Sequence, residues 1–129
     1  MTEIHADRRP PSEPEVPLDL DAAGRELLEE ARSMASGRAA KSLTPGAHAP
    51  LTQTLLTLTA GHELGAHQAN GPATIYLLRG AVTITSDNVT VDLRAGDWAR
   101  IPTALHNLRA DEDVVALLTV APTTDPPRD

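Results

Sequence analysis

The sequence predicts an all-β domain of antiparallel strands, a sandwich or jelly roll, preceded by one amphipathic helix. After Gly37 the spacing of apolar residues changes from helical to alternating, and Thr, Val, Ile and Leu replace Glu and Arg as the main residues. About nine short segments of this kind follow at nearly regular intervals with no helical pattern between them. Turn residues separate each segment from the next. Short strands with this spacing are typical of antiparallel sandwiches and jelly rolls.

The individual strands are placed by alternation and by the turns that bound them. The strongest turn is Asn70-Gly71-Pro72, because glycine tolerates positive φ and proline fixes its own φ and donates no hydrogen bond. Strands are expected at residues 39–43, 51–59, 65–69, 73–78, 81–85, 89–93, 98–101, 105–109 and 114–120.

One amphipathic helix is expected within residues 18–36. Asp19 and Asp21 suit the positive start of a helix, and Gly37 suits its C-terminal cap. Its apolar positions recur at helical spacing: Leu20, Ala23, Leu27, Leu28, Ala31 and Met34. This apolar stripe has to pack on the barrel of its own chain or on a partner subunit.

The chain is long enough for one domain, because it has 129 residues. We expect the barrel to occupy residues 38–120. Residues 1–17 and 121–129 are polar and rich in proline, a composition that buries too little apolar area to order itself. They are therefore predicted to be a disordered N-terminal tail and a flexible C-terminal tail.

Composition argues against several classes of partner. The formal charge is −7 and Lys41 is the only lysine, which disfavours nucleic acid. Cysteine is absent, so no disulfide and no thiolate metal site can form. No apolar run approaches the ~20 residues of a membrane-spanning helix. We expect a cytoplasmic protein without a membrane partner.

Two stretches carry a family resemblance. Residues 61–80 read GHELGAHQANGPATIYLLRG, and residues 96–106 read GDWARIPTALH. They resemble the two motifs of the cupin superfamily: a Gly, a His-x-His pair, a Glu and a closing Gly, followed by a Gly, a Pro and a later His. The resemblance extends over about residues 38–120, and it is to small single-domain bacterial cupins of the cupin-2 conserved-barrel type. It implies an RmlC-like jelly-roll β-barrel with one N-terminal helix.

The resemblance implies an incomplete metal site. Aligned on the closing glycine, the first family histidine falls on His67, but the second falls on Ala69 and the glutamate on Ala73. The third histidine falls on His106. His67 and His106 are thus the candidate ligands for a divalent transition metal such as Fe, Zn, Ni or Mn, although no cofactor is assigned with certainty.

Three further side chains are candidate replacements for the missing ligands, because each lies on or beside a strand that can line the cavity. They are Gln53, His48 and His62, none of which occupies a family ligand position. The two histidines are expected to lie in exposed loops.

The resulting functional hypothesis is a small cupin that binds a small molecule in its barrel, with His67 and His106 as polar anchors and a degenerate or absent metal site. The predicted pocket residues are His67, His106, Gln53, Ile75 and Leu77. No catalytic residue is assigned. Two alternatives stay open: a metal-dependent cupin enzyme of the oxygenase or isomerase type, and a dimeric interaction protein with a vestigial cavity. A homodimer is expected in each case.

The sequence also predicts positions for the two aromatic residues and one arginine. Trp98 is expected to pack within its strand with its N–H bonded locally. Tyr76 is expected on the outer face or at an interface. Arg100 precedes Ile101-Pro102 and is a candidate for holding an anionic ligand at the barrel mouth.

Overall fold

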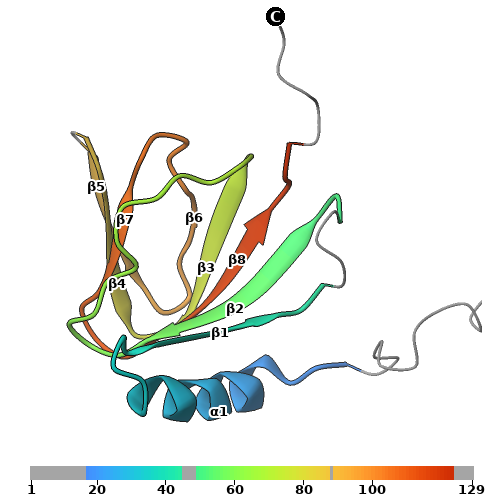
Figure 1. The fold of residues 1–129 in the computed structure, drawn as a ribbon, viewed down its shortest axis with the longest axis vertical. Coiled ribbons are helices and arrows are strands. Elements are labelled where there is room, and N and C mark those ends of the chain that lie inside the picture. Colours follow the sequence, from blue (N-terminus) through green and yellow to red (C-terminus); the bar gives the residue numbers. More distant parts are fainter. Residues whose placement is uncertain (1–16, 45–48, 88, 124–129) are drawn as a thin grey trace, which may run out of the picture.

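The computed structural model describes residues 17–44, 49–87 and 89–123, and it shows two antiparallel sheets with one helix outside the larger sheet (Figure 1). The larger sheet has the strand order β1-β2-β8-β3-β6, and the smaller has the order β5-β4-β7. The elements are α1 (Leu20–Arg32), β1 (Arg38–Ser42), β2 (Thr52–Leu58), β3 (Ala73–Arg79), β4 (Ala81–Ser86), β5 (Val89–Arg94), β6 (Trp98–Arg100), β7 (Asn107–Ala110) and β8 (Val114–Val120). The predicted all-β jelly roll with one N-terminal helix is confirmed.

The main hydrophobic core lies between the two sheets. Alternation along β3 shows how it forms: Ile75 and Leu77 are fully buried, whereas Tyr76 between them is exposed. The buried members of this core are Leu58, Ile75, Leu77, Val82, Ile84, Leu93, Leu108, Ala110, Val114 and Ala116. The interior of the barrel at this level is therefore filled by apolar side chains.

A second core lies between α1 and the outer face of the larger sheet. Leu27 and Ala31 of the helix pack there against Leu55 and Val115. The hydroxyl of the buried Thr57 lies 3.3 Å from the carbonyl oxygen of Leu27 and joins the helix to β2. The sequence left open whether the apolar stripe of the helix packs on its own chain or on a partner subunit. In the structure it packs on its own chain.

The boundaries of α1 follow its capping residues. The side chain of Asp19 accepts hydrogen bonds from the backbone N–H groups of Asp21 (3.0 Å) and Ala22 (3.1 Å). The helix ends at Arg32, and residues 33–37 form turns that lead to Gly37 at φ +66°. The predicted helix was therefore too long at its C-terminal end.

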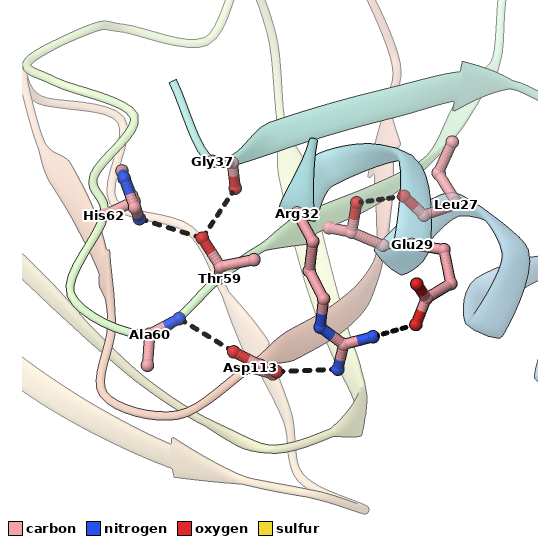
Figure 2. Close-up of polar contacts among 9 residues, drawn as sticks. Leu27, Glu29, Arg32, Gly37, Thr59, Ala60, His62 and Asp113 are labelled. Atoms are coloured by element: carbon pink, nitrogen blue, oxygen red, sulfur yellow. Dashed lines mark hydrogen bonds and ion pairs between the residues drawn. The ribbon is translucent and has the colours of Figure 1, made fainter. Parts of the chain in front are cut away.

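The loop between β7 and β8 holds the C-terminal end of α1. Arg32 lies between Glu29 of its own helix and Asp113 of the loop, and its guanidinium is 2.9 Å from the Asp113 carboxylate (Figure 2). The second carboxylate oxygen of Asp113 accepts a hydrogen bond from the backbone N–H of Ala60 at 2.9 Å. Asp113 therefore connects the end of α1, the loop after β2 and the loop before β8.

One predicted strand is absent. Residues 65–69 form no strand, and His67 makes only an isolated bridge to His106. Gly61 and Gly65 both adopt φ +87°, which interrupts the extended conformation that a continuous ladder needs.

The two predicted tails lie largely outside the described residues, which exclude 1–16 and 124–129. At the C-terminal side, the backbone N–H of Ala121 donates to Pro72 (3.0 Å) and that of Thr123 donates to Asn70 (2.8 Å). Within the described ranges, no helix is long and apolar enough to cross a membrane.

Candidate functional site

His67 and His106 lie side by side where the loop after β2 meets the start of β7. Their backbones exchange two hydrogen bonds, His67 N–H to His106 C=O at 2.9 Å and His106 N–H to His67 C=O at 2.8 Å. Their imidazole rings are 4.3 Å apart between centroids and inclined by 63°, edge towards face. The two residues that carry the family resemblance are thus brought together, although 39 positions separate them in the chain (106 minus 67).

Each imidazole is oriented by a backbone carbonyl group two residues earlier in the chain. Nδ1 of His67 lies 3.0 Å from the oxygen of Gly65, and Nδ1 of His106 lies 3.0 Å from the oxygen of Ala104. A carbonyl oxygen can only accept a hydrogen bond, so Nδ1 must carry the proton in both rings. In the neutral rings Nε2 is then an unprotonated acceptor.

The two histidines differ in burial. His106 is only 3% exposed, whereas His67 is exposed. A strand was expected at residues 65–69, but this segment makes only an isolated bridge, so strand alternation does not set the direction of His67. The pair therefore has one buried member and one member at the protein surface.

Two amide side chains hold the segment that carries His67. The Oδ1 atom of Asn107 accepts a hydrogen bond from Gly65 N–H at 3.0 Å, and its Nδ2 donates to Glu63 at 2.8 Å. Gln68 donates to the carbonyl oxygen of Thr103 at 3.0 Å. Asn107 was not predicted as a positioning residue, and its place directly after His106 is the one sequence feature that points to such a role.

An open groove of about 260 Å³ lies beside His106. Its lining is mixed, with apolar and polar side chains together. The residues that line it are Ala66, Thr85, Ser86, Asp87, Leu105, His106 and Asn107. The buried histidine thus has one side next to an accessible volume.

The other predicted pocket residues lie elsewhere. Ile75 and Leu77 are fully buried in the core between the sheets. Gln53 lies opposite Thr119 in the register of β2 and β8, and its side chain donates to the Thr119 hydroxyl at 3.2 Å. It shares a strand face with Leu55, which packs towards α1. The structure therefore does not bring Gln53 to the histidine pair.

The donor set does not fit a catalytic metal ion. Among the described residues, no group of three or more His, Cys, Asp or Glu side chains is arranged to hold one, whereas catalytic zinc generally uses three protein ligands. His62 is half-buried rather than exposed, and its Nδ1 is 2.8 Å from the hydroxyl of Thr59 (Figure 2). His48 lies outside the described residues.

Comparison with solved structures shows that the fold is that of the cupins. The chain is similar to a cupin superfamily protein from Desulfitobacterium hafniense (17% identity, TM-score 0.61, covering 67% of this chain and 78% of that one). It is also similar to a conserved protein of unknown function from Streptococcus pyogenes (27% identity, TM-score 0.62, covering 71% and 80%). The chain therefore has the fold of a small cupin.

An enzyme is also among the structural relatives. Salicylate 1,2-dioxygenase from Pseudaminobacter salicylatoxidans has 21% identity and a TM-score of 0.65, and the alignment covers 78% of this chain but only 33% of the dioxygenase. At this identity the likeness concerns the fold alone. No protein-family model matches the sequence, and no curated protein is significantly similar to it.

Proposed function

We propose that this cupin-like protein binds a small molecule, and that the Nε2 atoms of His67 and His106 accept hydrogen bonds from it. The observation that carries the proposal is the pair of Nδ1 contacts to carbonyl oxygens, at 3.0 Å in each ring. These contacts fix the tautomer and leave one acceptor free on each imidazole. A ligand with hydroxyl or N–H donors fits two such acceptors.

The surroundings of His106 support the proposal. A groove that joins apolar side chains to a few polar groups is the common form of a small-molecule site. The groove beside His106 has this mixture, because Leu105 and Ala66 lie next to Ser86 and Asn107. The exposed position of His67 leaves this side of the pair open to an incoming molecule.

The proposal is tested by thermal shift with a panel of hydroxylated aromatic compounds that includes phenol, catechol and salicylate. The dioxygenase with the same fold motivates salicylate as a probe. We expect at least one compound to raise the melting temperature of the wild type and to lose this effect in His106→Ala and in His67→Ala. Gln53→Ala is the matched control and is expected to keep the effect, since Gln53 lies on the face of the larger sheet that is turned towards α1. A panel without effect, or an effect that both histidine variants retain, contradicts the proposal.

Metal analysis of the same proteins tests the metal-dependent alternative. The Nδ1 contacts are also compatible with a metal-dependent protein, since a metal-ligating histidine commonly donates its other N–H to a carbonyl group. Fe, Zn, Ni or Mn bound near stoichiometry in the wild type and lost in both histidine variants would replace the hydrogen-bonding proposal by a two-histidine metal site. We expect no such stoichiometry, because the described residues provide no third ligand of the usual kinds.

A further inference from the structure

Tyr76 and Trp98 form an exposed aromatic pair on the outer face of the larger sheet. They are directly opposite each other in the register of β3 and β6, and they are 39% and 59% exposed. Tyr76 is also opposite Leu117 of β8, and Leu117 is opposite Leu55 of β2, which packs towards α1. The pair therefore lies on the helix side of the sheet, beyond the strands that α1 contacts most, which are β1, β2 and β8. The expectation that Trp98 packs within its strand is wrong.

A second row of side chains lies beside the aromatic pair on the same face and offers hydrogen-bond donors. Thr119 is opposite Thr74, and Thr74 is opposite Arg100, so these three residues follow one another across β8, β3 and β6. The side chain of Gln53 donates to the Thr119 hydroxyl at 3.2 Å, which leaves the hydrogen of that hydroxyl free for another acceptor. The guanidinium of Arg100 can only donate. This row therefore suits a group that accepts several hydrogen bonds.

A groove of about 360 Å³ brings the two rows together. Trp98, Arg100, Thr74 and Thr119 all line it, and the rest of its wall is mostly apolar. Its volume is in the range of small-molecule sites, which commonly combine apolar walls with a few polar groups. It shares no lining residue with the groove beside His106.

Arg100 gives this groove its charge. It is the only charged side chain among the described residues that line the groove, and it takes part in none of the ion pairs found between described residues. Asp97 is the closest acidic residue in the sequence, but its carboxylate accepts from the backbone N–H of Arg94 at 2.9 Å. The charge of the groove therefore complements an anion.

The spacing of the two rows limits the shape of that anion. Residues two apart on a strand share a face and are separated by about 7 Å. Thr74 and Tyr76 of β3 have this relation, and so do Arg100 and Trp98 of β6. A carboxylate joined to an aromatic ring through two carbon atoms matches this separation better than a carboxylate attached directly to the ring, as in benzoate.

We propose that this groove binds a small organic anion of the arylalkanoate class. The carboxylate pairs with the Arg100 guanidinium, a geometry in which two parallel hydrogen bonds can form, and accepts from the hydroxyls of Thr74 and Thr119. The aromatic ring packs against the exposed indole ring of Trp98. This site is separate from the histidine pair and does not depend on what that pair binds.

The probe for this site is 3-phenylpropanoate, and its binding is measured by equilibrium dialysis and by the fluorescence of Trp98, the only tryptophan of the chain. We expect saturable binding and a fluorescence change with the same midpoint. Arg100→Ala is expected to weaken binding about tenfold, because a charge-assisted hydrogen bond is lost. Thr119→Val keeps the shape of the side chain without its donor and is expected to weaken binding about threefold. Arg94→Ala removes one exposed positive charge from the other sheet and is the matched control, expected to bind as the wild type.

Two further compounds separate the charge from the ring. The neutral 3-phenylpropanamide and the shorter benzoate are both expected to bind more weakly than 3-phenylpropanoate. Absence of saturable binding to the wild type at about millimolar probe would overturn the proposal. Equal binding of the acid and the amide, or binding that Arg100→Ala retains, would also overturn it, since Arg100 would then not hold the carboxylate. Trp98 fluorescence that changes with protein concentration in the absence of probe would show that a second copy covers the groove, and would overturn it as well.

Discussion

The carboxylate of Asp113 joins the end of α1 to the sheet, because it accepts from Arg32 at 2.9 Å and from the backbone N–H of Ala60 at 2.9 Å. The Ala60 N–H and the Arg32 guanidinium both stabilise the charged form and lower the pKa of Asp113 below its usual value. The same contact raises the pKa of Arg32. Asp113, in the acidic turn between β7 and β8, therefore holds the end of the helix.

The first prediction concerns the pH dependence of this contact. A depressed pKa in the folded state means that the stabilisation by Asp113 is complete above the unfolded pKa of about 3.9 and is lost as pH falls through the lower folded value. Asp113→Asn is expected to cost about 1 kcal/mol at pH 7, typical of a partly solvated hydrogen bond. Urea unfolding between pH 7 and pH 3 should show the two proteins converging at the acid end. Glu112→Gln, in the same turn and exposed, serves as the control. A difference that stays constant down to the lowest pH would contradict the assignment.

The second prediction concerns Gly80, which has φ +89° and lies against the loop that contains Asp113. A Cβ atom at this position would come within 2.1 Å of the carbonyl oxygen of Asp113. Gly96 has a similar φ of +95°, but nothing lies within 4 Å of its Cβ position. Gly96→Ala should therefore cost only the conformational penalty of about 1 to 2 kcal/mol. Gly80→Ala should cost at least about 3 kcal/mol, because backbone strain and the clash add. If urea titration gives the same loss of unfolding free energy for Gly80→Ala and Gly96→Ala, the Asp113 backbone can move away from residue 80, and the clash does not contribute.

The third prediction concerns the buried hydroxyl of Thr57. Its Oγ1 lies 3.1 Å from the carbonyl oxygen of Ala39 and 3.3 Å from that of Leu27. Thr57→Val keeps the shape of the side chain and removes the donor, and should lower the free energy of unfolding by about 1 kcal/mol. Thr57→Ser keeps the hydroxyl and loses a methyl group. Because valine keeps the shape of the side chain, a lower melting temperature of Thr57→Val reports the lost hydrogen bond and not a change in packing. Unchanged stability of this variant would refute the role of the hydroxyl.

Periodicity and turn residues were sufficient to predict α1 and eight strands, because alternation and turn chemistry are local properties of the chain. They failed at residues 65–69, since the positive φ of Gly61 and Gly65 breaks the ladder without changing the apolar pattern. Gln53 was expected in the pocket, but it shares a face of β2 with Leu55, which packs towards α1. Alternation shows which residues share a face and does not tell which face turns inward.

For the histidine pair too, local sequence patterns predicted one part of the structure and missed another. The motifs singled out His67 and His106, and the structure places them in contact. Their different burial depends on an irregular segment held by the side chain of Asn107, a long-range contact that leaves no pattern in the sequence. The exposure of Trp98 likewise depends on where α1 covers the sheet.

The tautomers of His67 and His106 decide whether Nε2 can accept hydrogen bonds from a ligand, and they are measured by long-range proton–nitrogen NMR on protein labelled with ¹⁵N-histidine. The spectra are recorded at about pH 8, where an ordinary histidine is neutral, and assigned with His67→Gln and His106→Gln. We expect both rings to be protonated at Nδ1 and unprotonated at Nε2, and we expect a binding compound from the thermal-shift panel to shift the Nε2 signals. Rings protonated at Nε2 would contradict the two carbonyl contacts and remove the acceptors on which the proposed function rests.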